Sequence, residues 1–338
     1  MLNKLHIISL IVFPVILLFT IFLSKKLKLV DKPNLRKVHK TDVVNTSGFI
    51  LSLFMVYITG VSEFSKLLEN IVILGFLIAL IGFFDDRVEM KPSTKFFLTL
   101  FPVSYLILND FTLTNLGKYE YINFIELGKA SVPFTFLAVM LLVNAINYID
   151  GTDGLLIGYS ITTLSYFYFL SDKQSEYTFL IIIFIYILLI SLIFNFLSIR
   201  SGFKSFVGDA GSLFISFFIS FTLIFLYKFE EIHPAFLIWA CWLPVYDFLH
   251  VTFNRLIIKK NFSKPDKSHF HHYVLVFFSN NHFKTFLFIN LLNFFIIFIG
   301  YVVCVNIGKI YSLFLFIILF FVFMLLKSKF KKINSLAL

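Results

Sequence analysis

The chain has 338 residues, of which 59% are hydrophobic and only 14% are charged, with a formal net charge of +10. A soluble domain carries about 25% charged residues, so this composition excludes a soluble protein. The apolar residues gather in repeated runs of about 17–24 residues, which is long enough for a helix to cross a bilayer. The sequence therefore predicts an all-α polytopic membrane protein.

About eleven transmembrane helices are predicted along the chain. In order, they cover residues 6–24, 47–62, 67–84, 95–109, 132–148, 154–170, 177–197, 210–227, 234–256, 283–305 and 308–327. The first run lacks a small-residue cleavage site, so we expect a retained helix and not a signal peptide. Alternating residues near 110–131 indicate a short β-hairpin outside the membrane. Without internal repeats or linkers, residues 1–338 are predicted to form a single integral-membrane domain.

The basic residues predict the orientation of these helices. Cytoplasmic loops of membrane proteins carry an excess of Lys and Arg. If the Lys-rich segment from Lys327 to Lys332 is cytoplasmic, alternation of the spans assigns 22 of the 29 basic residues to the same side. We therefore expect a cytoplasmic C-terminus and an N-terminus outside.

Two adjacent carboxylates, Asp85 and Asp86, end the third predicted helix on its cytoplasmic side. A solvated helix end is one explanation. However, a helix C-terminus carries partial negative charge, which makes acidic residues there unfavourable. Carboxylate oxygens are ligands that Mg²⁺ prefers when it shares its shell with phosphates. The pair is therefore a candidate cation site.

A second polar cluster joins the fifth and sixth predicted helices. Asn144, Asn147 and Asp150 are three residues apart and share one broad helix face. Asp153 follows in a glycine-containing turn. An Asx-rich turn that caps the next helix is the alternative, but capping needs only one Asp.

Three further segments are predicted on the cytoplasmic side. Gly208-Asp209-Ala-Gly211 opens the eighth helix, where Asp209 is either an N-cap or a cation ligand beside phosphates. The last long loop contains histidines without the spacing of a structural zinc site. Attraction of these basic loops to anionic lipid is the alternative to phosphate binding. Their candidate residues are His269, His271 and His272 in the last loop, and Arg36, Lys37 and His39 in the first.

Together these motifs resemble the polyprenyl-phosphate N-acetylhexosamine-1-phosphate transferase superfamily. The resemblance rests on four stretches in the family's order: Phe84-Asp85-Asp86, Asn144-x-x-Asn147-x-x-Asp150-Gly-x-Asp153-Gly154, Gly208-Asp209-Ala-Gly211-Ser212-Leu213 and His269-x-His271-His272. The first loop, Asp31-x-Pro33-x-x-Arg36-Lys37-x-His39, is similar to the branch that transfers N-acetylglucosamine 1-phosphate. The family's usual prolines and Gly-Gly pair are missing from residues 43–48.

The resemblance implies a reaction and a set of roles. N-acetylhexosamine 1-phosphate would pass from a UDP-sugar to undecaprenyl phosphate in the bacterial cytoplasmic membrane, with release of UMP. Mg²⁺, or Mn²⁺ in its place, would be held by Asp209 and Asp86, while Asp85, Asp86 and Asp150 would be catalytic. Substrate contacts would come from Asn144, Asn147, Asp153, Phe206, Arg36, Lys37, His39, His269, His271 and His272. The expected partners are these two substrates, membrane lipid and a second copy of the chain, without nucleic acid.

Three alternatives stay open. A transferase of phospho-N-acetylmuramoyl-pentapeptide would use the same chemistry on another donor. An ion-coupled transporter would need charges at mid-membrane and broken helices, neither of which the sequence predicts. A non-catalytic membrane scaffold would tolerate replacement of Asp85 or Asp209 by Asn.

Overall fold

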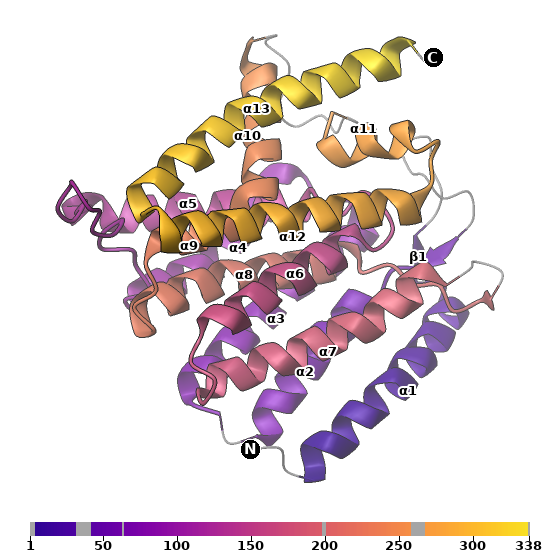
Figure 1. Ribbon diagram of the computed structural model, residues 1–338. Coiled ribbons are helices and arrows are strands. Elements are labelled where there is room, and N and C mark those ends of the chain that lie inside the picture. Colours follow the sequence, from indigo (N-terminus) through magenta and orange to yellow (C-terminus); the bar gives the residue numbers. More distant parts are fainter. Residues whose placement is uncertain (1–3, 32–41, 63, 198–200, 258–267, 337–338) are drawn as a thin grey trace. The chain divides into compact units, whose positions relative to one another are not determined.

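The computed structural model describes residues 4–31, 42–62, 64–197, 201–257 and 268–336, and these are almost entirely helical (Figure 1). The elements are α1 (Lys4–Lys26), β1 (Val30–Asp31), β2 (Val43–Val44), α2 (Ser47–Val61), α3 (Lys66–Val88), α4 (Pro92–Leu108), η1 (Gly128–Ala130), α5 (Ser131–Asn147), α6 (Leu155–Leu170), α7 (Glu176–Phe196), α8 (Gly208–Phe229), α9 (Pro234–Leu237), η3 (Ile238–Cys241), α10 (Trp242–Ile257), α11 (Phe270–Phe277), α12 (His282–Asn306) and α13 (Lys309–Leu336).

Each predicted helix corresponds to an observed helical segment, and the all-α membrane class is confirmed. Within the described residues, seven helical segments are long and apolar enough to cross a bilayer. Three shorter apolar helices, α2, α4 and α6, accompany them. The chain is therefore a multi-pass membrane protein.

The described chain divides into two compact units, each built from two separate stretches. Unit 1 comprises Met1–Tyr105 and Leu156–Phe221, and unit 2 comprises Leu106–Leu155 and Thr222–Leu338. That residues 1–338 form a single integral-membrane transferase domain stays a prediction.

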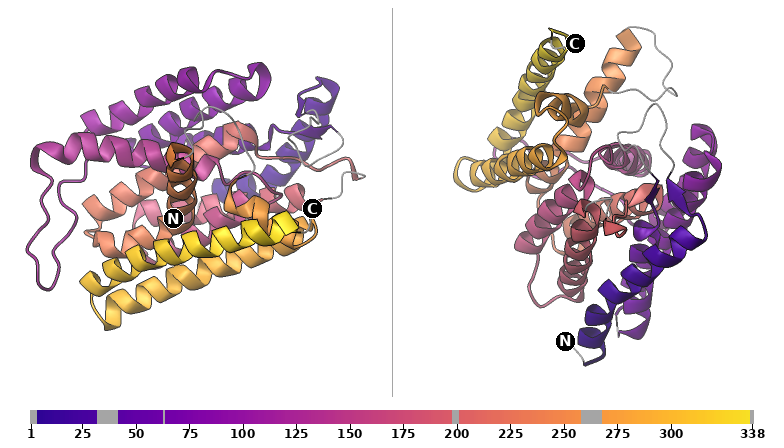
Figure 2. Two further views of the ribbon diagram at one scale, coloured as in Figure 1. Left: turned by 90° about the horizontal axis from the view of Figure 1, so that it is seen from above. Right: turned by 90° about the vertical axis from the view of Figure 1, so that its right-hand side faces the viewer.

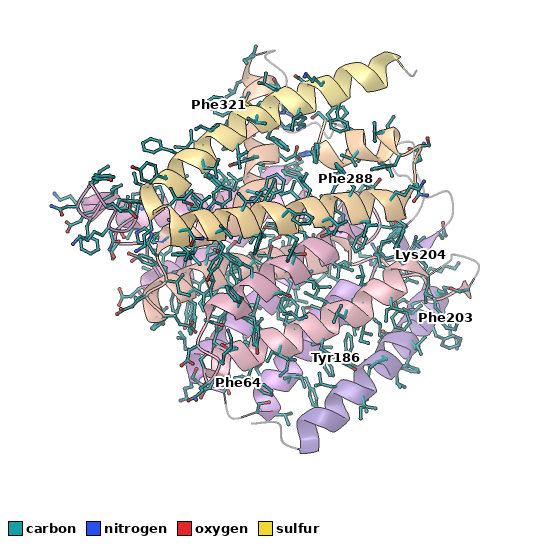
Figure 3. All side chains as sticks on the ribbon, viewed as in Figure 1. Phe64, Tyr186, Phe203, Lys204, Phe288 and Phe321 are labelled. Atoms are coloured by element: carbon teal, nitrogen blue, oxygen red, sulfur yellow. The ribbon has the colours of Figure 1, made fainter. Side chains whose placement is uncertain are left out.

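Unit 1 is packed around aromatic side chains of α7 and α8. Phe184 of α7 meets Phe214 and Phe218 of α8 edge to face, with ring centroids 5.6 and 4.8 Å apart. The α1 helix joins this bundle through Tyr186 of α7, whose hydroxyl donates to the Leu10 carbonyl at 3.0 Å (Figure 3). These contacts fix α8, which carries the predicted Gly-Asp motif at its start.

Glycines let three helices of unit 1 approach at backbone distance. A Cβ on Gly48 of α2 would lie 2.2 Å from the Val207 carbonyl oxygen, and one on Gly82 of α3 would lie 2.3 Å from the Asp209 carbonyl oxygen. Gly211 of α8 faces Gly48 in the same way. Small residues at such crossings allow membrane helices to pack closely. The start of α8 is therefore held against both α2 and α3.

In unit 2, α12 and α13 pack together near the turn that joins them and diverge beyond it (Figure 1), although they overlap in the view from above (Figure 2). Two buried indoles tie this pair to the preceding segment: Trp242 donates to Asn293 at 2.7 Å, and Trp239 donates to Ser312 at 2.8 Å. Only 17% of the apolar stretch of α13 is buried. Phe321, labelled in Figure 3, is 59% exposed, as expected for a helix face in contact with lipid.

The structure corrects the sequence prediction at three elements. Residues 269–272 were predicted in a loop, but they begin helix α11, whose eight residues are too few to produce a membrane-length apolar run. The predicted helix 234–256 contains a 3₁₀ turn, η3, shortly before Pro244, which lacks the N–H that an α-helical bond requires. Lys327, predicted in the tail after the last span, lies within α13 and is buried.

The predicted outside hairpin exists as a hydrogen-bonded loop. Backbone bonds join Leu116 to Ile125 and Tyr119 to Ile122, and a single antiparallel bridge pairs Asn115 with Glu126. This pairing is too short to form strands, because Gly117 adopts a positive φ of 99° within it.

Candidate active site

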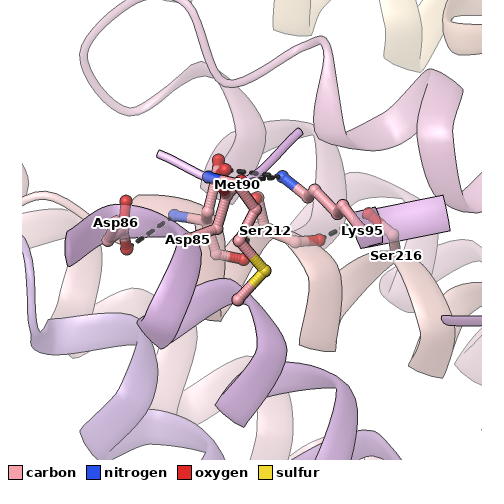
Figure 4. A network of polar contacts seen from close by, with 7 residues as sticks. Asp85, Asp86, Met90, Lys95, Ser212 and Ser216 are labelled. Atoms are coloured by element: carbon pink, nitrogen blue, oxygen red, sulfur yellow. Dashed lines mark hydrogen bonds and ion pairs between the residues drawn. The ribbon is translucent and has the colours of Figure 1, made fainter. Parts of the chain in front are cut away.

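Three of the predicted carboxylates lie together in unit 1. Asp85 and Asp86 occupy the last turn of α3, and Asp209 occupies the first turn of α8 (Figure 4). We call Asp85, Asp86, Asp209 and the nearby Lys95 the carboxylate cluster. The close crossing of α3 and α8 at Gly82 brings Asp85 and Asp86 to Asp209, which lies more than 120 residues later in the chain.

Asp86 acts as a cap for α8. Its Oδ2 accepts a hydrogen bond from the backbone N–H of Asp209 at 3.0 Å. An acceptor at a helix N-terminus satisfies a free N–H and is favoured by the helix dipole. Gly208, at φ +65°, precedes this bond, and a Cβ there would lie 2.6 Å from the same oxygen. The cap geometry therefore requires the glycine at position 208.

Asp85 is held in place at the C-terminal end of α3. Its Oδ1 accepts from the backbone N–H of Met90 at 2.7 Å, where Glu89, at φ +47°, has already turned the chain out of α3. This bond leaves Oδ2 of Asp85 directed at another partner.

That partner is Lys95 of α4, which sequence reasoning counted only as a cytoplasmic charge. Its Nζ lies 2.9 Å from Asp85 Oδ2 and 2.5 Å from Asp209 Oδ2. The three side chains are 19%, 13% and 36% exposed, respectively. The Lys95 ammonium pairs with two of the three carboxylates of the cluster, whose oxygens are also suitable ligands for a further cation.

The donor set of the cluster fits Mg²⁺. Hard carboxylate oxygens from two elements converge on one point, which the Lys95 ammonium marks, and the cluster contains no thiolate. Across the described ranges, no group of three or more His, Cys, Asp or Glu side chains is arranged as a complete metal site. A metal bound here would therefore need Lys95 to move and other ligands, such as water and substrate phosphate, to complete its shell.

Arg87 follows the Asp pair and was not predicted as a site residue. Its Nη1 donates to Asn45 Oδ1 at 2.9 Å, and its guanidinium lies 5.0 Å from the centre of the Phe83 ring. The side chain thus contacts the loop before α2, and its charge also acts on Asp86 of the carboxylate cluster.

Phe206 lies two residues before α8 and is half-buried. Its N–H donates to the Val44 carbonyl at 2.7 Å, and its carbonyl accepts from the Ser47 hydroxyl at 2.6 Å. The Lys204 ammonium lies 5.4 Å from the centre of the ring. An aromatic ring held by its backbone beside a cation suits the predicted stacking with a base, which stays a prediction.

The Asn and Asp residues of the second motif all lie in unit 2. Asn144 and Asn147 are half-buried in the last turn of α5, and Asp150 is exposed in the turn that follows. The backbone N–H of Asp153 points at His282 Nδ1 of α12 at 3.3 Å, and its carboxylate lies 3.8 Å from the same nitrogen. His282 is a neighbour of the motif that the sequence did not identify.

The three predicted histidines occupy different environments at the start of α11. His269 is the N-cap residue, and its ring stacks on Tyr148 with centroids 5.2 Å apart. His271 is buried against Gly151, where a Cβ would lie 2.0 Å from its Nε2. Burial, together with the neighbouring His272 and His269, lowers the pKa of His271 well below its usual value, so its ring is neutral at pH 7. His272 is half-buried beside it.

A buried charge pair beside these histidines was missed entirely. Asp247 of α10 accepts from His269 Nδ1 at 2.8 Å, from the Phe270 N–H at 2.9 Å and from Lys327 Nζ at 2.6 Å. Both charged side chains are almost fully buried. An isolated Asp and Lys that are 80 residues apart give no motif, so only the fold reveals their pairing.

The structure therefore places the predicted residues in two groups. Unit 1 contains Asp85, Asp86, Phe206 and Asp209, whereas unit 2 contains the Asn/Asp motif and the three histidines. Arg36, Lys37 and His39 lie outside the described residues. The prediction that both groups serve one site stays a prediction.

The model of glycosyl transferase family 4 matches residues 68–227, a range that contains both Asp motifs, Phe206 and Asp209. A Bacillus subtilis protein named "Probable undecaprenyl-phosphate N-acetylglucosaminyl 1-phosphate transferase" is 29% identical over 269 residues, which are 75% of this chain and 71% of that protein. Over residues 68–227, slightly less than half of its length, the chain is similar to glycosyl transferase family 4.

Two further relatives carry the same kind of name. The undecaprenyl-phosphate alpha-N-acetylglucosaminyl 1-phosphate transferase of Salmonella typhi is 28% identical over 275 residues, or 77% of this chain and 74% of that protein. The protein of the same name in Escherichia coli O157:H7 is 26% identical over 268 residues, which are 77% of this chain and 72% of that protein. The family match and the names of these relatives agree with the resemblance that the motifs indicate. The histidines at 269–272 lie beyond the range that the family model matches.

Proposed function

We propose that this chain is a member of glycosyl transferase family 4 and transfers N-acetylhexosamine 1-phosphate, most simply GlcNAc 1-phosphate, from a UDP-sugar to undecaprenyl phosphate. UMP leaves, and a lipid diphosphate sugar is formed as the first intermediate of a cell-envelope glycan. The names of the relatives support this reaction, and the convergence of Asp85 and Asp209 on one cationic point is the structural observation that carries it.

The reaction must bring two anions together, and the carboxylate cluster is suited to that problem. One phosphoanhydride is broken and another is formed, so the step is near balance and depends on positioning and charge neutralisation. Mg²⁺, when bound by Asp209 and Asp86, would neutralise the diphosphate. Lys95 is positioned to pair with a phosphate oxygen once it leaves the two carboxylates.

Asp85 is the candidate group that orients the attacking lipid phosphate. A strong base is not required, because the second pKa of a phosphate monoester is about 6 and the nucleophile is already ionised at pH 7. Asp150 and Asn147 would organise the diphosphate, whereas Asp153 and Phe206 would hold the uracil.

We further propose that the site faces the cytoplasm, with the C-terminus on the same side and the N-terminus outside.

The proposal is tested with purified full-length protein, polyprenyl phosphate and a panel of donors. We expect Mg²⁺-dependent release of UMP from UDP-N-acetylhexosamines, and incorporation of labelled UMP into the donor because the reaction is reversible. Release only from UDP-N-acetylmuramoyl-pentapeptide would favour the peptidoglycan branch. No UMP release from any donor would contradict the reaction class, and donor-independent ion or solute uptake would favour a transporter.

A further inference from the structure

Asp247 lies outside every motif that supports the proposed function, yet it is the centre of a buried polar network in unit 2. It is 6% exposed, and its carboxylate receives three donors from two different elements. Lys327 of α13 is 1% exposed and supplies one of them. A buried charge is retained only when it is paired and hydrogen-bonded, which this arrangement achieves completely.

The network determines which nitrogen of His269 carries the proton. Oδ1 of Asp247 already accepts from the Lys327 ammonium and from the Phe270 N–H, so the carboxylate is held in its ionised form. An ionised carboxylate can only accept, so the bond between Asp247 Oδ2 and His269 Nδ1 requires the proton on Nδ1.

The orientation of the His269 ring is fixed by its neighbours. One face stacks on Tyr148 at 5.2 Å, with 25° between the planes, and the His271 ring lies parallel at 5.9 Å, with 7° between the planes. In the neutral ring, with Nδ1–H donated to Asp247, Nε2 is the acceptor, and it lies on the side of the ring away from the carboxylate. Such an acceptor suits a sugar hydroxyl or amide N–H, and it cannot donate to a phosphate oxygen.

We propose that Asp247 is a positioning residue that, with Lys327, fixes His269 in the Nδ1–H tautomer and so presents Nε2 as an acceptor to the donor sugar. This inference rests on the proposed function, because it names the donor sugar as the ligand of His269. A carboxylate that selects a histidine tautomer is a known device, and loss of the carboxylate leaves the ring in the wrong tautomer.

The first test is a kinetic cycle with Asp247→Asn and His269→Gln in the full-length protein. Asn keeps the size and the acceptor for the Phe270 N–H, but it presents an N–H to His269 Nδ1. We expect the KM for the UDP-sugar to rise about tenfold to a hundredfold, with the KM for polyprenyl phosphate unchanged. A purely structural defect would lower kcat through a smaller active fraction and leave both KM values alone.

The double variant shows whether Asp247 acts through His269. We expect Asp247→Asn to add no further loss in the His269→Gln background, since the interaction is already absent. The proposal would be overturned if the rise in donor KM of the double variant equalled the product of the two single rises. It would also be overturned if Asp247→Asn kept the wild-type donor KM.

A charge-balanced variant separates positioning from folding. Asp247→Asn leaves Lys327 buried without a counter-ion, whereas Asp247→Asn with Lys327→Gln removes both charges. We expect this double variant to unfold near the temperature at which the wild type unfolds, while its KM for the UDP-sugar stays raised. Recovery of the donor KM together with stability would show that the network only supports the fold.

A spectroscopic readout is independent of activity. In protein labelled with ¹⁵N-histidine, the signals missing from His269→Gln identify His269. We expect them to show Nδ1–H in the wild type and Nε2–H in the charge-balanced variant, and the same tautomer in both would contradict the inference. If the wild type releases no UMP, the proposed function fails and this spectrum still decides the tautomer; if His269→Gln is fully active, the proposed function stands and the positioning role fails.

Discussion

Lys95 is bound by two carboxylates at once, at 2.9 Å from Asp85 and 2.5 Å from Asp209. Its ammonium occupies the point at which their oxygens converge, so a metal ion must compete with it for the same oxygens. Because all three side chains are partly exposed, solvent weakens the pairing, and the ammonium can be displaced at moderate cost.

This competition predicts the effect of removing Lys95. We expect Lys95→Gln to bind Mn²⁺ about tenfold more tightly, which corresponds to about 1.4 kcal/mol, because the competing cation is lost. Binding is measured by electron paramagnetic resonance on purified protein, so the result does not depend on turnover. Lys91→Gln, at an exposed lysine four residues earlier, should bind as the wild type does. Unchanged or weaker binding in Lys95→Gln would contradict a cation site between these carboxylates.

At the scale of single residues, the sequence predicts the carboxylates but not their partners. Asp85, Asp86 and Asp209 are conspicuous because acidic residues are costly at the ends of apolar helices. Lys95, Asp247 and Lys327 were not predicted, since a single Lys or Asp near a helix end is ordinary in a membrane protein. Their role depends on contacts between residues that are 10 to 114 positions apart, and no local pattern encodes such pairs.

At the scale of helices, the site depends on how closely α2, α3 and α8 approach. We expect Gly48→Ala, Gly82→Ala or Gly211→Ala to destabilise the protein by at least about 1–3 kcal/mol, because the added Cβ would overlap with backbone or side-chain atoms at 2.1 to 2.3 Å. Thermal unfolding in detergent measures the loss.

Gly60 provides the matched control for this series. It lies in α2, as Gly48 does, and a Cβ there would meet nothing within 4 Å. Gly60→Ala should leave the protein unchanged or stabilise it by up to about 1 kcal/mol, since Ala favours the helix. Equal destabilisation at Gly60 and Gly48 would show that helix propensity, and not close packing, accounts for the effect.

A second helix-scale prediction concerns the start of α13. The exposed Glu120 carboxylate accepts the N–H groups of Lys309 at 2.6 Å and Ile310 at 3.0 Å. Burial alone would raise the pKa of Glu120, but these backbone donors lower it below its usual value. The stabilisation is therefore present above the unfolded-state pKa and is lost as the pH falls through the lower folded-state pKa.

We expect Glu120→Gln to lower the free energy of unfolding by about 0.5–2 kcal/mol at pH 7. The difference from the wild type should shrink as the wild-type carboxyl becomes protonated. Glu126→Gln, at an exposed carboxylate of the same loop, should have little effect. If both variants behave alike at every pH, Glu120 does not cap α13.

The sequence predicted the helices correctly where their hydropathy alone determines that they form. Eleven apolar runs became eleven helical segments, whereas α11 was missed because its eight residues are stabilised by packing of Phe270, Val274 and Leu275. The short length of α11 and the turn at η3 are tertiary features, and a search for membrane-length runs does not detect them.

For the molecule as a whole, the distribution of basic residues predicts which ends face the cytoplasm. Both native cysteines, Cys241 and Cys304, are buried, so an introduced cysteine can be labelled selectively. We expect Lys118→Cys to react with a membrane-impermeant maleimide in intact cells, and Lys91→Cys to react only after the membrane is opened. Both positions are exposed. The reverse pattern would contradict the predicted orientation.

The central claim is that Asp85 and Asp209 carry the transfer reaction. The most direct test measures Mg²⁺-dependent release of UMP from UDP-GlcNAc and polyprenyl phosphate by purified wild type, Asp85→Asn and Asp209→Asn. Glu69→Gln, at the other end of α3, is the control. We expect near-total loss of release in both Asp variants and wild-type release in the control. Retained release in both Asp variants would contradict the account.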